Sequence, residues 1–148
     1  MIQTSGSLVF CDGYDYRVEN ECWVNTPITD EPWRIMSGGR LLAWRDSAGR
    51  VYLLPGYSWN GVGGNQWRDI VPDINMMMRA SAFHDAGYQA IGEGGEPSFR
   101  REWWDHFFAD LCVQDGLPSL LRQTVYEAVH IFGASHAARH SRAVLVAP

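Results

Sequence analysis

The pattern of apolar residues changes once along this chain, near Asp73, and that change limits the folds open to it. Before Asp73, short apolar runs alternate with turn residues, as in the strands of an antiparallel sheet. After Asp73, apolar residues recur at helical spacing in three segments. No linker is long enough to separate two domains. We therefore expect one α+β domain over residues 1–148, with a small antiparallel N-terminal sheet followed by three main helices, the first two an antiparallel pair.

The β-rich part spans residues 1–55, and its clearest element is a hairpin. Residues 40–45 and 50–54 read as its strands, and Asp46-Ser47-Ala48-Gly49 between them offers a glycine for a positive φ. Pro55 ends the pairing because it has no amide hydrogen to donate. Shorter strands are expected at residues 8–10, 14–18 and 22–24.

A Gly-rich, aromatic loop is expected over residues 56–72, ahead of a helical part over residues 73–148. A long structureless stretch in a compact domain is typical of a functional loop. Three helices are expected after it. The first is capped by Asp73 and ends near Ile91, the second runs from Ser98 to Gly116, and the third opens at Pro118 and is interrupted at Gly133. The tail beyond Gly133 is expected to carry one more short helix.

Composition excludes several classes of function. The net charge of −5 argues against nucleic-acid binding, which needs a basic face for the phosphates. Three cysteines without metal-ligand spacing indicate a reducing compartment, and neither a signal peptide nor a transmembrane segment is expected. Seven tryptophans are too many to hide fully. We expect Trp59 and Trp67, in the Gly-rich loop, to face a partner or a lipid interface.

One group of polar residues has a spacing suited to chemistry. His84 and Tyr88 lie one turn apart on the first expected helix, with Asp85 about 100° around its axis. Asp105 lies on the second helix and can meet His84 if the two helices are antiparallel. A hydrogen bond from Asp105 would fix the imidazole as a general base, and Tyr88 could donate to the same carboxylate. The alternative is that these residues form only a satisfied buried polar network.

Several segments, at matching spacing, resemble the domain-of-unknown-function 1353 family of small phage and bacterial proteins, which has no agreed function. They are residues 56–61, 78–89 and 125–133, together with Arg100, Arg101 and Asp105. The resemblance implies a phage-associated protein, located in the virion or the host cytoplasm. The family pattern has an Asp in an aromatic-Asp-Gly loop, whereas this chain has Trp59-Asn60-Gly61. Asn60 removes a formal charge and weakens any metal site there.

A second resemblance concerns the first two helices. A His-Asp-x-x-Tyr sequence followed by an Asp on the next helix looks like the core of secreted phospholipases A2. That resemblance implies that His84 is the general base for a water, that Asp85 binds Ca²⁺ and that Asp105 orients His84. The calcium loop would be Asn60 to Gly64, with Asn60, Gly61 and Gly63 as ligands beside Asp85. The bracing disulfides of those enzymes have no counterpart here, and the β-rich front is foreign to them.

Two main hypotheses of function remain open. The first is a divalent-metal-dependent hydrolase of the phospholipase A2 type, acting at a host envelope. The second is a non-catalytic phage tail or virion component, with a protein partner or an oligomeric assembly. A weaker third is an effector that binds a host protein through its aromatic residues. If His84, Asp85 and Asp105 converge at a cleft that solvent reaches, the hydrolase hypothesis is favoured. If they form a dry, closed network, the structural role is favoured.

Overall fold

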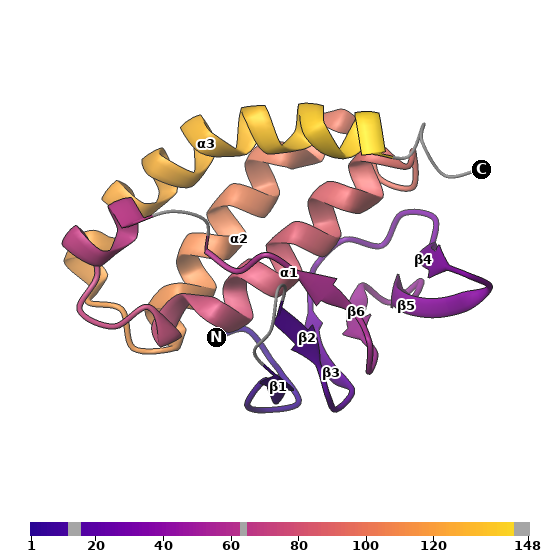
Figure 1. Ribbon diagram of the computed structural model, residues 1–148, viewed down its shortest axis with the longest axis horizontal. Coiled ribbons are helices and arrows are strands. Elements are labelled where there is room, and N and C mark those ends of the chain that lie inside the picture. The colour runs from indigo at the N-terminus through magenta and orange to yellow at the C-terminus, as the bar shows by residue number, and fades with distance from the viewer. Residues whose placement is uncertain (12–15, 63–64, 144–148) are drawn as a thin grey trace.

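The computed structural model describes residues 1–11, 16–62 and 65–143. Two antiparallel sheets are followed by three long helices, which confirms the α+β prediction. The sheets lie on one side of α1 and α2, and α3 lies on the side away from the strands (Figure 1). Among the described residues, no helix is long and apolar enough to cross a membrane.

The larger sheet contains four antiparallel strands in the order β3-β6-β5-β4. They are β3 (Cys22–Asn25), β4 (Trp33–Ser37), β5 (Arg40–Arg45) and β6 (Arg50–Leu53). The predicted hairpin is confirmed as β5 and β6, and Gly49 adopts a φ of 96° in its turn. Strand β4 was not predicted, although its signal was present: buried Trp33 and Ile35 flank exposed Arg34.

The smaller sheet corrects the prediction of a structureless loop over residues 56–72. It contains β1 (Phe10–Cys11), β2 (Tyr16–Val18) and β7 (Ser58–Trp59), in the order β1-β2-β7. Residues Asn65–Asp69 then form the short 3-10 helix η1. The reason is aromatic packing, because the indole of Trp59 lies 5.6 Å from the rings of both Phe10 and Tyr16 and draws this segment into the core.

The helical part begins with α1 (Asn75–Gly92). It continues through η2 (Ser98–Arg100), α2 (Arg101–Gln114), η3 (Ser119–Leu121) and α3 (Arg122–Ala143). The side chain of Asp73 accepts a hydrogen bond from the backbone N–H of Asn75 at 2.9 Å, close to the predicted helix start. The predicted break at Gly133 is wrong, since α3 runs through it to Ala143 without a separate tail helix. Residues 144–148 lie outside the described part.

Gly133 has a packing role in place of the predicted helix break. A Cβ atom at this position would lie 2.4 Å from the hydroxyl of Tyr88. The glycine therefore lets α3 approach α1 closely, and its cost in helix propensity is about 1 kcal/mol.

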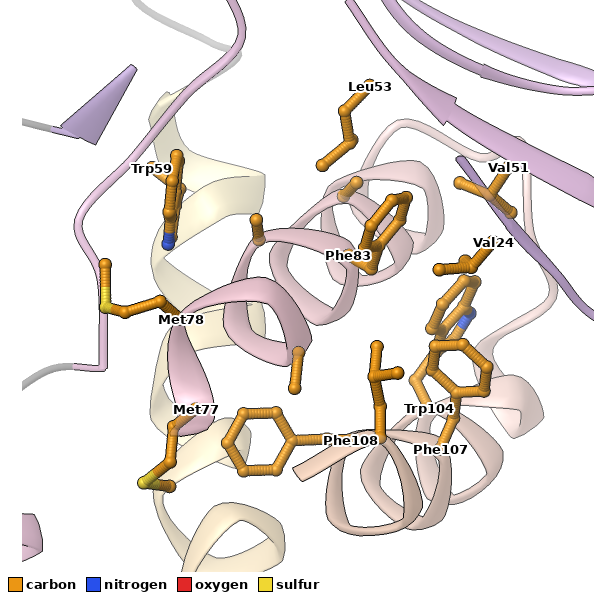
Figure 2. Close-up of a cluster of buried hydrophobic side chains, with 14 of the residues drawn as sticks. Val24, Val51, Leu53, Trp59, Met77, Met78, Phe83, Trp104, Phe107 and Phe108 are labelled. Atoms are coloured by element: carbon orange, nitrogen blue, oxygen red, sulfur yellow. The ribbon is translucent and has the colours of Figure 1, made fainter. Parts of the chain in front are cut away.

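The main core lies between the larger sheet and the first two helices. Val24, Val51 and Leu53 project from the strands toward Phe83 of α1 and Trp104 of α2 (Figure 2). All five side chains are fully buried. The two helices approach closely at Gly87, where a Cβ atom would lie 2.3 Å from the Trp104 ring. The packing of α1 against α2 therefore depends on the missing side chain at this position.

Replacing Gly87 with Ala should lower the free energy of unfolding by about 1–3 kcal/mol, because the new methyl group overpacks a rigid indole. Chemical denaturation monitored by circular dichroism would measure the change. Gly92→Ala is the matched control, since Gly92 is the exposed last residue of the same helix. Equal stabilities of the two variants would contradict this account of the helix contact.

Candidate functional site

The candidate site is built around the carboxylate of Asp105, which is fully buried on α2. Its Oδ1 atom accepts hydrogen bonds from Nε2 of His84, at 2.7 Å, and from the hydroxyl of Tyr88. Its Oδ2 atom lies 2.8 Å from Nδ1 of His130. The predicted pairing of His84 with Asp105 is confirmed, and so is the contact from Tyr88. The carboxylate thus joins α1, α2 and α3.

Burial and the three hydrogen-bond donors shift the pKa of the Asp105 carboxyl in opposite directions. Burial alone would raise the pKa of its carboxyl, but the hydrogen bonds from His84, Tyr88 and His130 outweigh burial and lower it below the usual 3.8. Asp105 is therefore ionised at neutral pH, and all three partners donate to it. Burial and the neighbouring Asp105 charge raise the pKa of Tyr88, which keeps the phenol protonated as a donor.

His84 is held firmly and is only 5% exposed. Its ring lies between Tyr88, at a centroid distance of 4.1 Å, and Phe108, at 5.3 Å. Its second nitrogen, Nδ1, lies 3.8 Å from Oδ1 of Asp85, which is beyond ordinary hydrogen-bond reach. Burial alone would lower the pKa of His84, but the carboxylates of Asp105 and Asp85 raise it above the usual 6.5. One nitrogen is therefore anchored while the other faces a negative charge.

His130 is the member of the network that the sequence reasoning missed. It lies on α3, and 43% of its side chain is exposed, in contrast to buried His84. Arg101 holds it in place, since one guanidinium nitrogen donates to the backbone oxygen of His130 and Nε donates to the Tyr88 hydroxyl at 3.2 Å. The only signal was indirect: residues 125–133 formed one of the segments in the family resemblance, but nothing in the spacing related α3 to Asp105.

Asp85 lies on α1 one turn after Ser81, which contacts the segment that leads into the predicted calcium loop. The side chain of Asp85 is 16% exposed. Burial raises the pKa of the Tyr57 phenol, and the charge of Asp85 raises it further. One turn before Asp85, Ser81 accepts a hydrogen bond from the Trp59 indole at 2.9 Å. Residues 57–59 therefore lie along the Asp85 side of α1.

The predicted calcium ligands are only partly brought together. Asn60 is exposed, and Gly61 is buried with a φ of 75°, packed so closely against Tyr16 that a Cβ atom would lie 2.5 Å from the ring. Gly63 lies outside the described residues. Within the described part of the chain, no three His, Cys, Asp or Glu side chains gather as metal ligands. Asp85 is thus the one charged oxygen ligand in the predicted set.

The prediction that Trp59 and Trp67 face a partner is wrong. Trp59 is 4% exposed and Trp67 is 3% exposed, because both complete the hydrophobic core. The indole N–H of Trp59 is satisfied by Ser81, and the Trp67 ring lies 6.3 Å from Phe108. The sequence shows that the loop is aromatic, but only the fold shows that other elements cover its aromatic side chains.

Solvent reaches the network at its edges and not at its centre. Asp105 and His84 are buried, whereas the side chains of Asp85 and His130 are 16% and 43% exposed. A pocket of about 540 Å³ lies elsewhere, at the beginning of α1. It is lined by residues 6–8, Phe10, Asn75, Met78, Arg79 and Asp115, and no member of the network contributes to it.

Comparisons with family models, curated proteins and solved structures found no match to this chain. The two family resemblances and their implied functions therefore stay predictions.

Replacing Asp105 with Ala should lower the free energy of unfolding by about 3–5 kcal/mol, because it leaves the buried donors His84 and Tyr88 and the partly exposed His130 without their acceptor. Asp110→Ala is the matched control. Asp110 lies on the same helix in an exposed ion pair with Arg122, and its loss should cost at most about 1 kcal/mol. Denaturant titration of both variants measures the difference, and similar losses would show that the Asp105 network contributes little.

Proposed function

We propose that this protein is a hydrolase in which His84 removes a proton from an attacking water. The observation that carries the proposal is the asymmetry of the imidazole. Its Nε2 atom is anchored 2.7 Å from a fully buried carboxylate, whereas Nδ1 lies 3.8 Å from Asp85 without an ordinary hydrogen bond. An anchored imidazole with one free nitrogen is the usual form of a general base.

Asp105 would act as the positioning residue. Its negative charge stabilises the imidazolium that forms when Nδ1 takes the proton, and Tyr88 and His130 keep the carboxylate in place. The water oxygen forms the new bond to the electrophilic carbon of an ester, and His84 returns the proton to the departing alkoxide. Atoms and charges balance without a further reactant.

The substrate class follows from the phospholipase A2 resemblance, which suggests a lipid ester of a host envelope. The resemblance to the domain-of-unknown-function 1353 proteins suggests a phage origin, with the protein in the virion or the host cytoplasm. Asp85 would be the charged ligand of a Ca²⁺ ion that polarises the ester carbonyl. Because Ca²⁺ prefers six to eight oxygens and the described set offers one carboxylate, the fit is poor. The proposed proton transfer does not depend on the ion.

A structural role is the second candidate, and the burial of the network favours it. Asp105 is fully buried with three donors from two other helices, and His84 is 5% exposed. Such a network also serves to join α1, α2 and α3 in a phage tail or virion component. In that case the same residues act through stability and assembly alone.

The His84→Ala variant tests the hydrolase. We expect the wild type to release fatty acid from phospholipid vesicles or nitrophenol from short-chain nitrophenyl esters. The variant should lose about 10²–10⁴-fold in rate. A general base acts when unprotonated, so the raised pKa of His84 should place the rising limb of the pH–rate profile above 6.5.

His106→Ala is the matched control, since this partly exposed imidazole on α2 does not contact Asp105. His130→Gln separates the two imidazoles of the network. Loss of turnover in His130→Gln with a fully active His84→Ala would assign the base to His130 and overturn the role of His84. If the wild-type protein hydrolyses none of these esters, the hydrolase proposal fails and the structural role remains.

Thermal melts address the metal separately from any substrate. If Asp85 binds Ca²⁺, the ion should raise the melting temperature of the wild type, because a ligand of the folded state stabilises it by mass action. Asp85→Asn should remove that shift, and a chelator should reverse it in the wild type. Melting curves unchanged by Ca²⁺ or any other divalent ion would rule out the metal-dependent form of the hydrolase.

A further inference from the structure

The outer face of the larger sheet carries a row of aromatic side chains. Trp23 on β3 lies opposite Tyr52 on β6, and Tyr52 lies opposite Trp44 on β5. Arg34 on β4 continues the row, opposite Trp44. Successive side chains of a strand point to opposite faces, and the neighbours of these residues form the buried inner face. The aromatic row, Trp23, Tyr52 and Trp44, therefore points away from α1 and α2.

The rings of the aromatic row present their edges to solvent. Trp44 and Tyr52 are stacked with centroids 4.3 Å apart and planes within 6°. The separation of the rings is close to the spacing of adjacent strands. The ring planes are therefore perpendicular to the direction from one strand to the next, and the ring edges point away from the sheet. The guanidinium of Arg50 covers the Trp23 ring at 3.8 Å and is held by a hydrogen bond of 2.8 Å to Asn25. Bases and sugars need an open ring face, so the row is not a stacking platform.

The polar tips of the aromatic row are available to a ligand. In the parts of the chain that the structure describes, neither the indole N–H of Trp23 or Trp44 nor the Tyr52 hydroxyl makes a hydrogen bond. The three rings are each partly exposed. Each therefore combines an apolar body with a free polar group, as side chains at the boundary between an apolar and an aqueous phase do.

The charged side chains within the strands of the row are all positive, although the chain as a whole carries −5. None of the four strands contains an Asp or a Glu. Arg34 and Arg40 are exposed and Arg50 is partly exposed, whereas Arg45 points inward to its buried partner Glu96. Arg34 and Arg50 thus lie beside the aromatic row, whereas the guanidinium of Arg40 is bound to the backbone oxygen of Pro55. Glu21 and Asp46 flank the strands directly before β3 and directly after β5. The excess of arginine within the strands suits an anionic partner.

We propose that this face docks the protein on an anionic phospholipid surface. Upright indole and phenol rings between arginines have the composition that concentrates at the bilayer interface. Arginines near such a surface each contribute a roughly fivefold gain in affinity for anionic lipid. The inner side of the same sheet covers the core (Figure 2), so docking is separate from the Asp105 network and does not rest on the proposed hydrolysis.

Vesicle binding tests the proposal without any turnover. The wild type is mixed with phosphatidylcholine vesicles, with or without phosphatidylglycerol, and bound protein is measured by sedimentation. Tryptophan quenching by brominated acyl chains reports on contact with the lipid. We expect binding that requires phosphatidylglycerol, weakens with salt, and quenches fluorescence. Replacing both Trp23 and Trp44 with Phe should remove most of the quenching.

The matched charge variants decide the location of the contact. Arg34→Gln should weaken binding about fivefold, whereas Arg17→Gln should change it little. Arg17 is equally an exposed arginine, but it lies on β2 of the other sheet. His84→Ala should bind vesicles normally, so docking and the proposed hydrolysis can fail independently.

Four outcomes of the vesicle experiments would overturn the proposal. They are the absence of vesicle binding, equal binding to neutral and anionic vesicles, equal effects of the two arginine variants, and quenching that persists without Trp23 and Trp44. Capture of the protein by soluble polyglutamate without vesicle binding would also overturn it, because it would assign the face to an acidic protein partner. Circular dichroism of each variant confirms that the fold is retained.

Discussion

The structure depends on placing one negative charge, the carboxylate of Asp105, where water does not reach it. A buried carboxylate is tolerated only when donors replace its hydration. His84 and Tyr88 supply them from α1, and His130 supplies one from α3. Because the donors come from two other helices, satisfying this single side chain also fixes how three helices lie against one another.

Two glycines make the arrangement possible by letting the helices approach. Gly87 leaves room for the Trp104 ring between α1 and α2, and Gly133 leaves room for the Tyr88 hydroxyl beneath α3. Without the second contact, Tyr88 could not reach Asp105 while α3 supplies His130. Close apolar packing and the polar network are therefore coupled, and a substitution in either should disturb both.

Two groups of aromatic residues differ in their position in the fold. Trp59, Trp67 and Trp104 complete the core. Trp23 and Trp44 stand with Tyr52 on the outer face of the sheet, where arginines accompany them. The buried ion pair between Arg45 and Glu96 belongs to the inner side of the same strands. One sheet thus separates a core face from an outer face, and its four strands contain no acidic residue.

Local patterns in the sequence were enough to predict the α+β class, the hairpin of β5 and β6, and the pairing of His84 with Asp105. Each depends on alternation, turn chemistry or spacing within neighbouring elements. The sequence could not reveal that His130 shares Asp105, since that contact requires α3 to cross the first two helices. Nor could it say which tryptophans are exposed, because composition does not specify which side of a segment another element covers. The prediction at Gly133 was wrong for the same reason: a glycine inside a helix signals a break locally, and only the neighbouring Tyr88 explains why this position has no side chain.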